Sequence, residues 1–136
     1  MRRLDVVPGT FAVCRLAAET SVPAWSQRGP LYAVTRTPDE LSIVCDAAHV
    51  PGDVPAEGPW RAFRVAGTLD FALTGILHDV LDPLADAGIS VFALSTFDTD
   101  YVLVRAERLA EAAMARRGVS RAGRQACVNG CWHRSA

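Results

Sequence analysis

The sequence predicts an α+β fold of short strands and two helices, and two observations lead to this class. Apolar side chains recur at helical spacing from Ile76 to Leu84, a pattern typical of the buried face of a helix. Several other short runs are rich in β-branched and apolar residues, which favours strands. These predicted strands are residues 10–16, 31–36, 41–45, 60–65, 90–96 and 101–104.

The first half of the chain is expected to contain strands that are joined by turns and loops. Pro8 and Gly9 are typical of a turn that ends a charged lead-in. Residues 37–40, Thr-Pro-Asp-Glu, suit a type I turn because proline presets φ and aspartate bonds nearby backbone groups. The strands on either side of this turn should therefore form a hairpin. A single helical turn is expected after Pro23, and the Pro- and Gly-rich residues 46–59 are expected to form a loop.

Residues 67–104 are the most strongly patterned part of the chain, with a helix followed by two strands. Gly88 lies where this helix should end, because glycine adopts a left-handed conformation without steric cost. A polar turn at residues 97–100 should join the two strands. A second helix is expected at residues 106–117, where early acidic and late basic residues complement the helix dipole.

The resulting order of elements is close to two βαββαβ halves, the first with degenerate helices and the second without a final strand. Antiparallel strands with helices on one face make an α+β sandwich of the ferredoxin-like kind. Residues 118–136 are basic, poor in apolar side chains and without pattern, so we expect a disordered tail there.

Composition and charge exclude several classes of protein. Hydrophobic residues make up 50% of the chain and charged residues 21%, as in ordinary globular proteins. The formal net charge of −1 does not favour binding to nucleic acid. No apolar run approaches the roughly 20 residues that span a bilayer, and no apolar leader follows Met1. We therefore expect a cytoplasmic protein that binds neither nucleic acid nor membrane.

The cysteines fall into two groups, and neither predicts a metal or a cofactor. Cys14 and Cys45 lie inside strand-like runs and are interpreted as small core residues. Cys127, Cys131 and His133 supply three soft ligands without a fourth nearby, so they support a structural zinc site poorly.

Catalytic motifs are also lacking. His49 and His78 are isolated and have no nucleophile or metal-binding sequence around them. A nucleophilic cysteine would need a neighbouring base, whereas the strand cysteines are expected in the interior. The sequence therefore predicts a protein that is not an enzyme.

Two features suit a small zwitterionic ligand. The first-turn amides of the helix that starts near Thr74, Gly75 and Ile76 lack helical partners and suit a carboxylate, although Gly75 is equally explained as a packing or helix-start glycine. Asp98 and Asp100 have three interpretations that the sequence leaves open: turn formers, ligands of a hard cation, or acids that hold an α-ammonium group.

Three segments resemble small bacterial ACT-domain proteins. They are residues 35–45 (TRTPDELSIVC), residues 88–92 (GISVF) and residues 95–104 (STFDTDYVLV), of which the last is the most specific. These segments are also similar to the ACT modules of CASTOR-type arginine sensors and of lysine-sensitive aspartokinases. The resemblance covers approximately residues 10–117.

The resemblance implies an ACT fold with two tandem or intertwined subdomains, residues 10–65 and 66–117, each with an antiparallel sheet and helices on one face. It also implies a non-catalytic regulatory protein that binds an amino acid. The implied ligand-binding residues are Ser42, Ile43, Thr74, Gly75, Ile76, Thr96, Phe97, Asp98 and Asp100. The alternative is a module that keeps the fold without a ligand and forms a homodimer through its edge strands.

Overall fold

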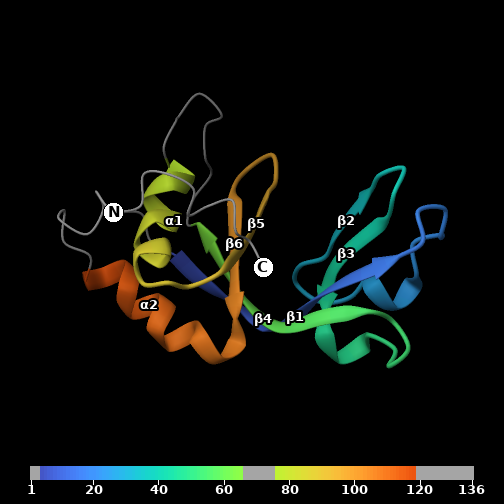
Figure 1. The fold of residues 1–136 in the computed structure, drawn as a ribbon, viewed down its shortest axis with the longest axis horizontal. Helices are drawn as coiled ribbons and strands as arrows, with labels where there is room; N and C mark the ends of the chain where they lie inside the picture. The colour runs from blue at the N-terminus through green and yellow to red at the C-terminus, as the bar shows by residue number, and fades with distance from the viewer. Residues whose placement is uncertain (1–3, 66–75, 119–136) are drawn as a thin grey trace. The chain divides into compact units, whose positions relative to one another are not determined.

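The computed structural model describes residues 4–65 and 76–118 (Figure 1). Its strands are β1 (Leu4–Leu16), β2 (Ala33–Arg36), β3 (Leu41–Asp46), β4 (Ala56–Val65), β5 (Val91–Ser95) and β6 (Asp100–Arg105). Its helices are α1 (Ile76–Asp86) and α2 (Leu109–Gly118). Single 3₁₀ turns form η1 (Ala24–Ser26), η2 (Ala47–His49) and η3 (Ala106–Arg108).

Strands occur at all six predicted places, but two of them begin earlier than expected. β1 starts at Leu4 rather than at residue 10, and β4 starts at Ala56 rather than at residue 60. The turn expected at Pro8 and Gly9 was wrong, because both residues lie inside β1, where Gly9 has a φ of 92°. Glycine adopts this conformation without a Cβ clash, so the strand continues through an irregular point.

The chain divides into two compact units, and two strands pass through both. We call Val7–Arg61 the N-terminal unit, and residues 4–6 together with 62–65 and 76–118 the C-terminal unit. Hydrogen bonds link the strands in the order β2-β3-β1-β4-β6-β5. Because β1 and β4 contribute to each unit, the C-terminal unit obtains from residues 4–6 the final strand that its own half of the sequence lacks.

The core of the C-terminal unit lies under both helices. Phe63 and Val65 are two residues apart on β4, as are Val102 and Val104 on β6, so each pair points to a single face. These side chains form one buried cluster with Val80, Leu81 and Leu84 of α1 and Ala112 of α2. The two helices therefore cover the same face of these strands, as predicted (Figure 1).

The end of α1 confirms the predicted role of Gly88. Gly88 has a φ of 73°, and its amide donates to the carbonyl of Ala85 at 2.9 Å. The amide of Ile89 donates to the carbonyl of Leu84, also at 2.9 Å, and the two side chains share the same core. This double hydrogen bond is a Schellman motif, in which a left-handed glycine satisfies the last carbonyls of a helix.

The N-terminal unit has a different core, because η1 and η2 take the place of helices. Cys14 of β1 and Leu41, Ile43 and Cys45 of β3 are fully buried, which confirms that both cysteines are core residues. The cluster is covered by partly buried side chains from turns and loops, namely Trp25, Ala47, Val50 and Val54. The β2–β3 hairpin predicted from the Thr-Pro-Asp-Glu turn is present.

Candidate ligand-binding site

The turn between β5 and β6 is closed by hydrogen bonds between two threonines. The amide of Thr96 donates to the carbonyl of Thr99 at 2.8 Å. The amide of Thr99 in turn donates to Oγ1 of Thr96 at 3.1 Å, and this hydroxyl also contacts the Thr99 carbonyl at 3.1 Å. The short threonine side chain thus replaces a backbone partner, and the four-residue connection is held in one conformation.

Thr99 also fastens this turn to the end of β4. Its side chain is buried, with 3% of its surface exposed, and its Oγ1 donates to the carbonyl of Val65 at 2.8 Å. The sequence did not single out Thr99, because a threonine in a polar turn is usually exposed. Only the neighbouring strand, 34 residues earlier in the chain, shows that this hydroxyl faces inward.

The other turn residues face solvent. The side chain of Phe97 is 81% exposed, and Thr96 and Asp98 are exposed as well. Asp100 is half-buried, and its Oδ1 accepts a hydrogen bond from Oγ of Ser95 across the start of the hairpin. Among residues 4–65 and 76–118, no basic side chain forms an ion pair with Asp98. The turn therefore presents one carboxylate whose charge is uncompensated by the described residues.

The remaining predicted site residues belong to other segments of the chain. Ser42 and Ile43 belong to β3 of the N-terminal unit, where Ile43 is fully buried and Ser42 is partly exposed. Ile76 is the first residue of α1. Thr74 and Gly75 lie outside the described residues, as do Cys127 and Cys131 of the tail.

The N-terminal unit contains a second turn of the same construction. The amide of Thr37 donates to the carbonyl of Glu40 at 2.9 Å, and Oγ1 of Thr37 accepts from the amides of Asp39 and Glu40 at 3.1 and 3.2 Å. The strand pairing repeats as well, since the pair Arg36 and Leu41 recurs 59 residues later as Ser95 and Asp100. A 3₁₀ turn follows the second strand of each hairpin.

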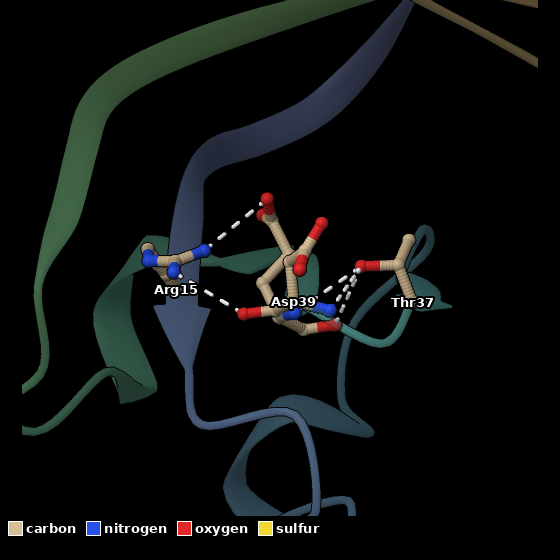
Figure 2. A network of polar contacts seen from close by, with 4 residues as sticks. Arg15, Thr37 and Asp39 are labelled. Atoms are coloured by element: carbon tan, nitrogen blue, oxygen red, sulfur yellow. Dashed lines mark hydrogen bonds and ion pairs between the residues drawn. The ribbon is translucent and has the colours of Figure 1, made fainter.

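A basic side chain contacts the two acidic residues of this second turn. Nη1 of Arg15 lies 3.2 Å from Oε2 of Glu40, and Nη2 donates to the carbonyl of Asp39 at 3.3 Å. Figure 2 shows the Arg15 guanidinium, which projects from β1, beside the turn that begins at Thr37. The N-terminal turn thus has an internal cation, whereas the described residues supply none to Asp98 in the C-terminal turn.

Two further features limit the chemistry of the described residues. Within residues 4–65 and 76–118, His, Cys, Asp and Glu side chains nowhere gather in a group of three that could hold a metal ion. None of the helices in this part of the chain is long and apolar enough to cross a membrane.

Two family models match successive parts of the chain. Residues 56–115 match the model of the ACT domain. Residues 9–53 match a second model, which describes an N-terminal domain.

Curated relatives include sensors of arginine. The chain is 32% identical over 90 residues to the putative protein CASTOR3P from Homo sapiens, and 30% identical over 93 residues to the human cytosolic arginine sensor for mTORC1 subunit 1. The aligned parts cover 57% and 60% of this chain. The chain spans about half of the length of the first relative (55%) and 28% of the second.

Solved structures show the same fold over most of the chain. Protein Atu0741 from Agobacterium tumefaciens is 39% identical, with a TM-score of 0.79 and coverage of 84% of this chain and 85% of that one. The regulatory subunit of aspartate kinase from Thermus flavus has a TM-score of 0.55 at 11% identity, covering 85% and 94% of the two chains, and shows the fold alone. The match thus identifies residues 56–115 as an ACT domain.

Proposed function

We propose that this chain is a non-catalytic regulatory protein that binds an amino acid at the acidic turn of its C-terminal unit. A regulatory role is supported by the ACT-domain match of residues 56–115 and by similarity to a protein named as an arginine sensor. The observation that carries the proposal is the rigidly held turn at residues 96–99, which exposes Asp98 without a basic partner among the described residues.

The charges of the proposed ligand follow from the two ends of the site. Asp98 would accept a hydrogen bond from the α-ammonium group, and a charge-assisted hydrogen bond of this kind is among the stronger polar contacts. The amides at the start of α1, from Ile76 onward, have no helical partner and would face the α-carboxylate. The hydrogen bond from Thr99 to Val65 would keep the acid in place, so that little conformational entropy is lost on binding.

The proposed place of action is the cytoplasm, because the curated relatives include proteins that are named cytosolic sensors.

Calorimetry with each of the twenty common amino acids tests the proposal. At least one of them should bind the intact chain, and Asp98→Ala should weaken that binding by about tenfold or more, since a charge-assisted contact is lost. The matched control is Asp39→Ala, which removes the aspartate at the same place in the N-terminal turn. Absence of binding at millimolar concentration, or an equal loss in both variants, would contradict an amino-acid site at this turn.

A second candidate function is a module that forms a homodimer without a ligand. It is favoured by β2, an outermost strand of the described sheet, because Val34 in this strand (38%) and Tyr32 just before it (48%) are exposed apolar side chains. Such an edge has unpaired backbone groups that a second copy can extend across a two-fold axis. Light scattering that finds a dimer without any amino acid, and a monomer for Val34→Lys, would favour this function over ligand binding.

A further inference from the structure

Two buried cysteines lie side by side on neighbouring strands of the N-terminal unit. Cys14 on β1 pairs with Ile43, and Cys45 on β3 pairs with Ala12, so the two cysteines occupy a diagonal of the antiparallel β1–β3 ladder. Both side chains point to the same face, because positions 12 and 14, and positions 43 and 45, are separated by one strand period. Their sulfur atoms are 4.0 Å apart.

This pair lies in the apolar interior. Cys14 is 1% exposed and Cys45 is 0% exposed, and both belong to the cluster that contains Leu41 and Ile43. Neither cysteine is part of a disulfide. The thiols share a hydrogen bond with each other, and the candidate ligand site makes no use of them.

The two thiols differ in acidity. Burial, together with the neighbouring Cys14 sulfur and the Asp46 carboxylate, raises the pKa of Cys45 to about 12. Burial also raises the pKa of Cys14, but a hydrogen bond from Cys45 opposes that shift. Cys14 is therefore the thiol that ionises more easily.

We propose that Cys14 and Cys45 form a redox-active pair, in which a hydroperoxide oxidises Cys14 and Cys45 then closes a disulfide between β1 and β3. The neighbouring positions and the 4.0 Å separation of the sulfur atoms carry this proposal. A disulfide bond is about 2 Å long, so the sulfurs need to approach by about 2 Å in total, which at this diagonal position requires side-chain rotation together with movement of the strands.

The reaction takes two steps, and its electrons balance. The Cys14 thiolate attacks one oxygen of hydrogen peroxide, the O–O bond breaks, and Cys14 becomes a sulfenic acid while hydroxide leaves and takes up the thiol proton as water. The Cys45 sulfur then attacks the Cys14 sulfur, the S–O bond breaks, and a second water leaves with the Cys45 proton. Two thiols are oxidised by two electrons, and one peroxide is reduced to two waters.

The burial of the two thiols predicts the rate of this reaction. The thiolate is the reacting species, and burial keeps both thiols protonated at neutral pH. Oxidation should therefore be slow in the folded protein at pH 7 and should accelerate as the pH rises. Once formed, the disulfide joins two strands whose cysteines are 31 residues apart in sequence, so it should raise Tm by restricting the unfolded chain.

Mass spectrometry of the full-length chain tests the proposal. Cys127 and Cys131 are replaced by serine so that only the proposed pair can react, and the folded protein is treated with hydrogen peroxide, quenched, unfolded and alkylated. The expected product has lost the mass of two hydrogens, takes up no alkylating reagent, and yields a peptide in which Cys14 is linked to Cys45. Peptide mapping of the unmodified chain after the same treatment must show the same link.

Single variants test the order of the two steps. In Cys45→Ser, the sulfenic acid on Cys14 cannot be resolved and should be captured by dimedone, whereas Cys14→Ser should show little capture at Cys45. Two alkylated cysteines after peroxide treatment of the folded protein, or a disulfide only between separate molecules, would overturn the proposal. Equal dimedone capture at both positions would overturn the assigned roles of Cys14 and Cys45.

Discussion

In the C-terminal unit two helices supply much of the core, whereas in the N-terminal unit 3₁₀ turns and loops cover the corresponding strands. Val80, Leu81 and Leu84 of α1 pack on β4 and β6 in the former. In the latter, Trp25 and Val54 shield a cluster that is centred on β1 and β3. The comparison shows that the strands of one sheet can be covered either by helices or by 3₁₀ turns and loops, provided that the covered face is apolar.

The polar turns of the two units are closed in the same way but differ in their other side-chain contacts. Both are closed by a threonine side chain, at Thr37 and at Thr96. Arg15 forms an ion pair with Glu40 of the first turn, whereas Thr99 ties the second turn to β4 and Asp98 has no basic partner among the described residues. The same turn construction therefore closes a hairpin with an ion pair in the N-terminal unit, whereas in the C-terminal unit it leaves Asp98 exposed to a ligand.

The largest loss of stability is expected from substitutions in the two cores. Leu84→Ala in the C-terminal unit and Leu41→Ala in the N-terminal unit each remove a fully buried side chain, and each should lower the free energy of unfolding by about 3 kcal/mol. Denaturant unfolding followed by circular dichroism measures the loss. Met114→Ala, at a position that is 71% exposed, serves as a control and should cost less than about 0.5 kcal/mol.

The same two variants test whether the units unfold together. Because β1 and β4 contribute to both units, we expect one transition in which either variant shifts the whole curve. Two separate transitions, each moved by only one of the variants, would show that the units are independent.

A smaller effect is expected where the acidic turn is attached to β4. Thr99→Val removes the donor to the Val65 carbonyl while it keeps the shape of the side chain, and it should cost about 1–3 kcal/mol because a buried acceptor loses its partner. Thr99→Ser retains the hydroxyl and is the matched control. A cost for serine as large as that for valine would mean that packing, rather than the hydrogen bond, holds the turn.

The smallest change in the free energy of unfolding is expected from loss of the ion pair at the N-terminal turn. Arg15→Gln breaks an ion pair whose side chains are 59% and 40% exposed, so the free energy of unfolding should change by less than about 1 kcal/mol, and the difference should shrink as salt is added. Arg108→Gln, which breaks the exposed ion pair between Arg108 of η3 and Glu111 of α2, is the matched control. A loss at Arg15 well above that at Arg108 would show that the internal cation is essential to the N-terminal turn.

The elements of this fold could be predicted from local patterns. Apolar spacing located α1, Gly88 marked its end, and the Thr-Pro-Asp-Glu turn located the β2–β3 hairpin, because each of these signals acts over a few neighbouring residues. The pair Pro8 and Gly9 misled the prediction for the same reason, since local turn chemistry does not show which strand lies beside a segment.

The sequence by itself thus determined the α+β class, most of the elements and the acidic character of the turn after β5. Only the tertiary structure decided that residues 4–6 complete the C-terminal unit, that Thr99 faces the end of β4, that Arg15 reaches the turn at Thr37, and that Cys14 lies beside Cys45. Each of these results depends on which strands are neighbours. Strand order is set by the burial of apolar faces over long sequence separations, which no local pattern records.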